Sequence, residues 1–120
     1  DKKYTVIYSL DGYDEISLTG NFKLIKNGGE YLLSPEDYSF EKVKDSELYG
    51  GENVEEAAKI FMSVLKGEGT KTQNDVVIAN SAVALNCMYP EKSMEACVEL
   101  AKRSIFDAQA LNVLKQVCEI

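Results

Sequence analysis

The chain has 120 residues, with 13 Lys and Arg against 20 Asp and Glu, so its formal net charge is −7, and it contains no His. The acidic balance argues against binding to nucleic acid or to an anionic membrane surface, because both need clustered basic side chains. Without His, the chain cannot supply a Ser-His-Asp or Cys-His catalytic group or an imidazole ligand for zinc. No apolar run reaches the ~18 residues that a transmembrane helix needs, and the length suits one domain.

The three cysteines, Cys87, Cys97 and Cys118, are odd in number and lack the Cys-x-x-Cys spacing of a zinc knuckle. This pattern indicates neither a disulfide framework nor a metal site. Each cysteine lies in an apolar, helix-like stretch, so we interpret all three as small buried hydrophobic residues in a reducing compartment, with a reactive thiol as the alternative. We therefore expect a cytoplasmic protein.

The first third of the chain predicts three short strands. Residues 4–8, Tyr-Thr-Val-Ile-Tyr, are apolar almost throughout, as in a strand that is covered on both faces. Residues 22–26 and 30–33 are two further β-prone runs, and residues 27–29, Asn-Gly-Gly, supply the positive φ that a tight hairpin needs. Residues 34–51 are mostly polar and predict an ordered loop with a helical turn.

The rest of the chain predicts helices. Asn53 is a favourable N-cap for a helix whose apolar residues follow i, i+3, i+4 spacing, and Gly67 is a favourable C-terminal stop. A second helix over residues 73–88 is apolar at most positions, which predicts burial nearly all round. A third helix begins at Ser93, and Asp107 marks a new cap or a kink before an apolar stripe that continues to the end.

One strand, a hairpin and three to four helices predict an α/β fold. A strand that is covered on both faces needs neighbouring strands, and a strand plus a hairpin provides too few for a sizeable sheet. The sequence also begins at Asp1 without an initiator Met. We therefore expect residues 1–120 to be a single unit that forms the C-terminal portion of a larger α/β domain.

Three carboxylates follow the first strand within five residues, in Asp11-Gly12-Tyr13-Asp14-Glu15. Ligand sites in open α/β sheets lie at the carboxyl ends of strands. Adjacent carboxylates repel each other unless a cation or a donor compensates, and Mg²⁺ binds one or two carboxylates together with waters and substrate phosphates. Asp14 and Glu15 are therefore candidate metal ligands, and Gly12 allows a tight turn beside them. The alternative is a solvated acidic turn.

Residues 11–20, Asp-Gly-Tyr-Asp-Glu-Ile-Ser-Leu-Thr-Gly, resemble the acidic motif of the anthranilate phosphoribosyltransferase family. Further similarities follow in the same order along the chain: the hairpin, Ser34-Pro-Glu-Asp37, Gly50-Gly51 before Asn53, Leu65-Lys-Gly-Glu68, Asp75, Asn80-Ser-Ala-Val-Ala-Leu85 and the closing helix from Ser93. The sequence departs from that family at Tyr8-Ser9, where His-Gly is often found, so whatever a His does there is lost or replaced.

The resemblance implies transfer of a phosphoribosyl group from phosphoribosyl pyrophosphate to anthranilate, a step of tryptophan biosynthesis. It implies that Asp14 and Glu15 bind Mg²⁺, with Asp11 as an outer-shell acceptor, and it assigns no catalytic residue to this chain. It places a glycine-rich phosphate loop, a helical domain and the substrate-binding residues before Asp1, and it implies a homodimeric full-length protein. We expect the 120 residues alone to be inactive, and to self-associate or to be marginally stable.

Two other functions remain open at this point. A segment of a pyrimidine nucleoside phosphorylase-like enzyme would share the architecture but would need no Mg²⁺–pyrophosphate site. A free-standing acidic interaction domain would fold as a monomer that is indifferent to Mg²⁺. Two polar features have simpler interpretations: residues 50–51, Gly-Gly, form a structural loop beside several glutamates, and Asn80 is a buried amide that pairs with backbone or with a neighbouring loop.

Overall fold

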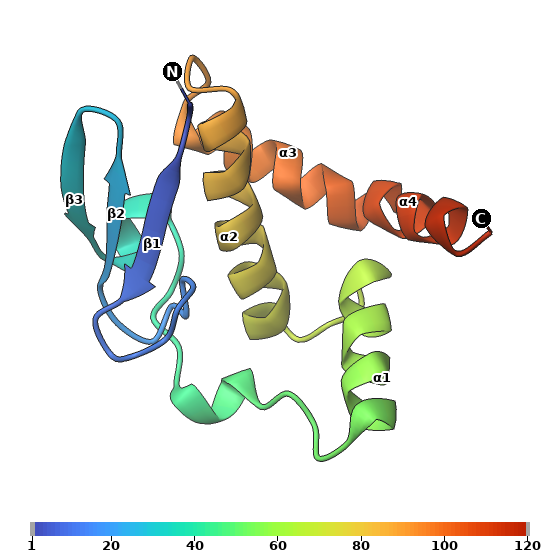
Figure 1. The fold of residues 1–120 in the computed structure, drawn as a ribbon. Helices are drawn as coiled ribbons and strands as arrows, with labels where there is room; N and C mark the ends of the chain where they lie inside the picture. Colours follow the sequence, from blue (N-terminus) through green and yellow to red (C-terminus); the bar gives the residue numbers. More distant parts are fainter. Residues whose placement is uncertain (1, 120) are drawn as a thin grey trace.

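The computed structural model describes residues 2–119 as a three-stranded sheet followed by four helices (Figure 1). The strands are β1 (Thr5–Ser9), β2 (Phe22–Lys26) and β3 (Gly29–Leu33). Two short 3-10 helices, η1 (Pro35–Tyr38) and η2 (Asp45–Leu48), precede α1 (Val54–Leu65), α2 (Lys71–Met88), α3 (Met94–Phe106) and α4 (Gln109–Cys118). The predicted α/β class is confirmed, as is the order of strand, hairpin and helices.

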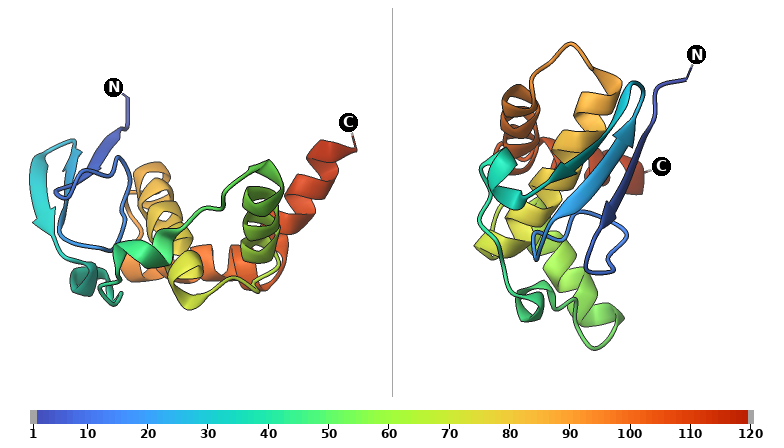
Figure 2. Two further views of the ribbon diagram at one scale, coloured as in Figure 1. Left: turned by 90° about the horizontal axis from the view of Figure 1, so that it is seen from below. Right: turned by 90° about the vertical axis from the view of Figure 1, so that its left-hand side faces the viewer.

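The sheet is antiparallel throughout, in the order β1-β2-β3, and only one of its faces is covered. Figures 1 and 2 show α2 on one side of the sheet and no other described segment on its opposite side. Alternate residues of β1 and β2, such as Ile7 and Leu24, therefore turn toward α2, whereas Val6 and Tyr8 are 49% and 37% exposed. Residues 2–119 cover only one face of residues 4–8, and the cover that we expect on the other face stays a prediction about a longer protein.

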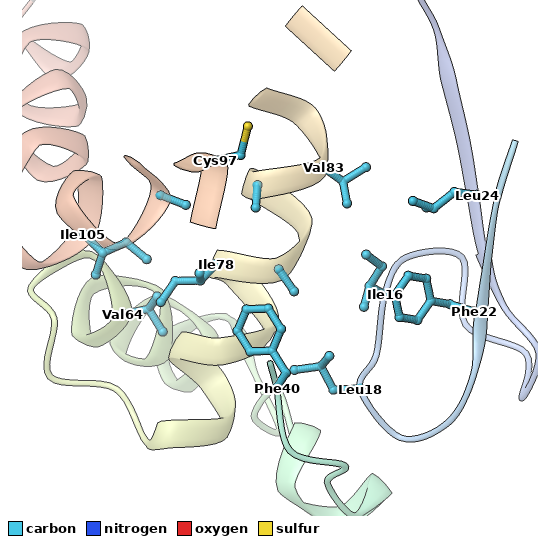
Figure 3. Close-up of a cluster of buried hydrophobic side chains, with 13 residues drawn as sticks. Ile16, Leu18, Phe22, Leu24, Phe40, Val64, Ile78, Val83, Cys97 and Ile105 are labelled. Carbon is cyan, nitrogen blue, oxygen red and sulfur yellow. The ribbon is translucent and has the colours of Figure 1, made fainter. Parts of the chain in front are cut away.

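Helix α2 lies between the sheet and α3 and carries the centre of the core (Figure 3). Ala79 and Ala82 are almost completely buried, and their small side chains allow close approach to α2. The larger core side chains come from every layer: Ile16, Leu18, Phe22, Leu24, Phe40, Val64, Ile78, Val83, Cys97 and Ile105. Burial of α2 nearly all round is only partly confirmed, because Val77 and Met88 are exposed.

Local capping explains where two of the helices begin and end. The Asn53 side chain accepts a hydrogen bond from the Glu56 backbone N–H at 2.9 Å, as predicted. Gly67 has φ of +73° and ends α1, since its N–H and that of the next residue bond to carbonyls of the last turn. The second helix begins two residues earlier than predicted, because Thr70 and Gln73 form a reciprocal capping box.

The C-terminal part of the chain departs most from the prediction. A break does occur near Asp107, but that residue ends α3, and Ala108, with φ of +59°, precedes α4 without a side-chain cap. Helix α4 extends away from the sheet (Figure 1), so Cys118 is exposed. Cys87 is half-buried, and Cys97 alone of the three is the fully buried hydrophobic residue that we expected.

Within residues 2–119, no helix combines the length and apolar character required to cross a membrane.

Candidate functional site

The acidic turn, residues 11–15, begins two residues beyond the end of β1, in the loop that connects β1 to β2. The side chains of Asp11, Asp14 and Glu15 are all exposed. Gly12 has φ of +102°, a conformation that favours glycine, so its predicted role in the turn is confirmed. The structure therefore brings the three sequence-predicted acids to the carboxyl end of a strand, as expected.

Ser9, the last residue of β1, holds the turn from the strand side. Its backbone N–H donates to the Tyr13 carbonyl at 2.9 Å, and its carbonyl accepts from the Gly12 N–H at 3.2 Å. Its hydroxyl, which is buried, donates to the Glu15 carbonyl at 2.7 Å. One residue thus fixes the beginning, middle and end of the turn.

A chain of hydroxyl groups links Ser9 to the first acid of the turn. The Ser9 and Ser17 hydroxyl oxygens lie 3.1 Å apart, and the Ser17 and Thr19 hydroxyl oxygens lie 2.7 Å apart. Because the Ser9 and Thr19 protons are donated to the Glu15 carbonyl and to Asp11, the single Ser17 proton serves one of these two contacts at a time. The Thr19 hydroxyl donates to Oδ2 of Asp11. Asp11 is therefore held inside the loop through one carboxylate oxygen, whereas its other oxygen makes no hydrogen bond within residues 2–119.

Asn80 of α2 holds the turn from the helix side. Its Oδ1 accepts from the Ile16 N–H at 3.0 Å, and its Nδ2 donates to the Ile16 carbonyl at 2.8 Å and to the Val76 carbonyl at 2.9 Å. The predicted pairing of the Asn80 amide with backbone is confirmed, but the side chain is half-buried where we expected it to be buried. Ile16 is the residue directly after Glu15, so α2 is tied to the acidic turn across 64 residues of sequence.

The segment after the turn anchors the loop in the core. Ile16 and Leu18 are each 1% exposed (Figure 3). Leu18 adopts φ of +62°, which is unfavourable for a branched side chain. Burial of its side chain and a hydrogen bond from the Val43 N–H to its carbonyl, at 2.9 Å, keep it there. Backbone strain held by surrounding contacts is frequent near binding sites.

The carboxylates of Asp14 and Glu15 make no hydrogen bond or ion pair with any residue from 2 to 119. Over the same residues, no group of three or more Cys, Asp or Glu side chains forms a metal site by itself. Two carboxylates nevertheless fit Mg²⁺, which takes one or two protein carboxylates and completes its coordination with waters and phosphate oxygens. A pocket of about 410 Å³ lies between the turn and α2, and Glu15, Val77 and Asn80 are among the residues that line it.

Two neighbouring features have structural explanations. A Cβ on Gly51 would lie 2.9 Å from Glu56 Cβ, and the residue has φ of +97°, which agrees with our interpretation of residues 50–51 as a structural loop. Glu47 joins η2 to α2, because the Lys44 backbone N–H and the Thr72 hydroxyl donate to its carboxylate. These two hydrogen bonds hold the pKa of Glu47 below its ordinary value.

Sequence reasoning found the acids but missed the groups that hold them. Ser9, Ser17 and Thr19 were not predicted to take part in the site. The alternation of hydroxyl and apolar residues in Ser17-Leu18-Thr19 was no reliable signal, because the segment is not extended: Leu18, between the two hydroxyls, has φ of +62°. The partner of Asn80 could not be found from a local pattern either, since it lies far away in the sequence.

Comparison with known proteins identifies the family and the fold of the chain. A family model described as "Glycosyl transferase family, a/b domain" matches residues 1–111. The anthranilate phosphoribosyltransferases of Bacteroides thetaiotaomicron and Phocaeicola vulgatus are 43% and 44% identical to this chain over 118 and 117 residues. Each alignment covers 98% of this chain but only 36% or 35% of the relative, so the chain spans about a third of the length of these relatives.

Solved structures show the same fold. The crystal structure of anthranilate phosphoribosyltransferase from Thermus thermophilus matches with a TM-score of 0.84 at 26% identity, over 93% of this chain and 33% of that one. The enzyme from Saccharomyces cerevisiae, solved in complex with PRPP and Mg, matches with a TM-score of 0.81 at 21% identity, over 92% and 32% of the two chains. The chain therefore belongs to the glycosyl transferase family that this a/b domain defines.

Proposed function

We propose that this chain is the part of an anthranilate phosphoribosyltransferase that holds its Mg²⁺. The Bacteroides and Phocaeicola relatives carry that enzyme name, and the yeast enzyme, which shares the fold, has been solved with PRPP and Mg. The observation that carries the proposal is the pair Asp14 and Glu15. These two adjacent, exposed carboxylates have no protein partner among residues 2–119 and lie on a turn that is fixed from two sides.

The proposed reaction moves a phosphoribosyl group between two substrates. The bond from the anomeric carbon of phosphoribosyl pyrophosphate to the diphosphate breaks, the anthranilate amino nitrogen bonds to that carbon, and the amine loses one proton. When bound, Mg²⁺ neutralises charge on the departing diphosphate. Asp14 and Glu15 would hold the ion through hard oxygen donors, and the free oxygen of Asp11 would be available as an outer-shell acceptor. No side chain of this segment acts as a nucleophile.

We further propose that the chain works within a longer protein. The outer face of the sheet exposes Val6, Tyr8 and Leu32 around the ion pair of Lys23 with Glu30, and exposed large apolar side chains gathered on one face are typical of an interaction surface. The remainder of the longer protein would cover it and would supply the residues that bind anthranilate and phosphate. The 120 residues alone should therefore be inactive and should scatter light as a species larger than a monomer. A monodisperse monomer would argue for a free-standing domain instead.

The experiment that tests the proposed function uses the complete protein. Asp14→Asn and Glu15→Gln keep the shape of each side chain and remove its charge. We expect each to lower turnover at limiting Mg²⁺ by about tenfold or more, since metal ligands and their supports commonly have effects of this size. Glu91→Gln is the matched control, because Glu91 is also an exposed acid but lies in the loop between α2 and α3.

Unchanged turnover at limiting Mg²⁺ in both turn variants would contradict the metal-binding role. The alternative enzyme is tested in the same preparation, by measuring whether phosphoribosyl pyrophosphate binds only when Mg²⁺ is present. Phosphorolysis of a pyrimidine nucleoside that is independent of Mg²⁺ would favour the phosphorylase and would overturn the proposed function.

A further inference from the structure

From the contacts between α2 and the acidic turn, we infer that Asn80 is a positioning residue that fixes the backbone from which the Glu15 side chain projects toward the cation. The inference rests on the proposed role of Asp14 and Glu15 as metal ligands. Asn80 touches neither carboxylate, and it would act entirely through the backbone of the turn.

The peptide unit that joins Glu15 to Ile16 is held on both of its edges. On one edge, the Ser9 hydroxyl of β1 donates to the Glu15 carbonyl at 2.7 Å. On the other edge, Oδ1 of Asn80 in α2 accepts from the Ile16 N–H at 3.0 Å. A planar peptide with both polar groups bound from opposite elements cannot rotate without losing a hydrogen bond.

Asn80 adds two further contacts that fix its own orientation. Its Nδ2 donates to the Ile16 carbonyl at 2.8 Å, so the amide pairs with both polar groups of one residue. The same nitrogen donates to the Val76 carbonyl one turn earlier in α2, at 2.9 Å. The amide is therefore held by its own helix and presents a fixed donor and acceptor to the loop.

Glu15 depends on this support because nothing else directs its side chain. The Glu15 side chain is exposed and makes no hydrogen bond or ion pair with residues 2–119, so the backbone of the turn is what fixes the point and the Cα–Cβ direction from which it projects. Two adjacent carboxylates repel each other, and a free turn would relax by separating them. Holding the Glu15–Ile16 peptide opposes that relaxation and keeps both acids ready for one cation.

The test compares two amides of α2 in the complete protein. Asn80→Ala removes all three hydrogen bonds, and Asn80→Asp keeps an acceptor for the Ile16 N–H but loses both donations. Asn86→Ala is the control, because Asn86 also bonds to neighbouring segments, with its Oδ1 accepting from Lys26 at 3.1 Å and its Nδ2 donating to the Lys92 carbonyl at 3.0 Å. The control loses comparable contacts that are remote from the turn.

We expect the Mg²⁺ concentration for half-maximal activity to rise about tenfold to a hundredfold in Asn80→Ala and in Asn80→Asp. Turnover at saturating Mg²⁺ should recover in the Asn80 variants, whereas Asn86→Ala should leave the half-maximal Mg²⁺ concentration at the wild-type value. The thermal unfolding midpoint should fall further in Asn80→Ala than in Asn86→Ala, because Asn80 makes three part-buried hydrogen bonds, whereas Asn86 makes two hydrogen bonds in all. If one Asn80 variant does not fold, the other carries the test. A half-maximal Mg²⁺ concentration within about twofold of wild type in a folded Asn80 variant would overturn the inference. If the wild-type protein itself shows no Mg²⁺ dependence, the proposed function fails instead, so the two failures are distinguishable.

Discussion

Replacing Ser9 by Ala should destabilise the fold by an amount that the hydrogen bonds of its hydroxyl determine. The hydroxyl donates to the Glu15 carbonyl at 2.7 Å, shares a hydrogen bond with the Ser17 hydroxyl at 3.1 Å and accepts from the Ser17 N–H at 3.3 Å. Ser9 is only 4% exposed, so water cannot fully replace these partners. Because a net hydrogen bond contributes roughly 1 kcal/mol and a buried group without a partner costs roughly 1–3, we expect a loss of about 2 kcal/mol.

The assay is equilibrium unfolding in urea, with the free energy of unfolding taken by linear extrapolation. Ser46→Ala is the control, because Ser46 is exposed on η2, and it should change the free energy by less than about 0.5 kcal/mol. The slope of the unfolding free energy against urea should stay the same in both variants. A Ser9→Ala effect no larger than that of the control would refute the reasoning that this hydroxyl holds the turn.

A double-mutant cycle extends this prediction to the opposite edge of the same peptide. Ser9→Ala and Asn80→Ala each release one side of the Glu15–Ile16 peptide, so their effects on unfolding should not add. We expect a coupling energy of about 0.5–3 kcal/mol, which is typical of residues in one hydrogen-bond network. Strict additivity would mean that the two side chains hold the turn independently.

Three further predictions concern the core, the turn and the pH dependence of stability. Phe22→Ala should lower the free energy of unfolding by about 3–5 kcal/mol, since the ring is 1% exposed and packs near Tyr38; a loss below about 1 kcal/mol in urea unfolding would contradict this. Gly12→Ala should lower the free energy of unfolding by about 1 kcal/mol, and the cause is its φ of +102° alone, because a Cβ there meets nothing within 4 Å. Gly50 is the control, since a Cβ there is equally free of contacts and the residue has no positive φ. An equal loss in Gly50→Ala would exclude backbone strain as the cause. The lowered pKa of Glu47 stabilises the fold above the ordinary Glu pKa, about 4.3, and this contribution is lost as the pH falls through the folded-state pKa. Glu47→Gln should therefore weaken the dependence of the urea midpoint on acidic pH, and an unchanged pH profile would contradict the assignment.

The sequence predicted those parts of the fold that depend on local chemistry. Asn53 and Gly67 mark the beginning and the end of α1, and the sequence could show this because capping involves residues within one turn of each other. The start of α2 was placed two residues late only because the Thr70–Gln73 capping box was overlooked. The burial of Cys118 was mispredicted for a different reason: an apolar stripe shows that a helix has an apolar face, but it does not show what covers that face.

The acids of the candidate site could be predicted from the sequence, whereas the residues that hydrogen-bond to the turn could not. Asp14 and Glu15 are neighbours in the sequence after a strand, so their placement at a strand end follows from the chain order. Ser9 and Asn80 together hold the turn that carries these acids. Asn80 lies 64 residues after Ile16, its hydrogen-bond partner, and no local sequence pattern indicates such a contact. The left-handed conformation of Leu18 likewise depends on tertiary burial, since no branched residue adopts it by local preference.

The central claim is that Asp14 and Glu15 bind a divalent cation, and paramagnetic Mn²⁺ tests it most directly. Titrated into the isotopically labelled complete protein, Mn²⁺ should first broaden the amide resonances of the acidic turn, residues 11–15. The combined variant Asp14→Asn and Glu15→Gln should abolish this selective broadening while leaving the rest of the spectrum dispersed. A folded wild-type spectrum in which the turn broadens no more than other exposed acidic segments, such as residues 36–37, would contradict the claim.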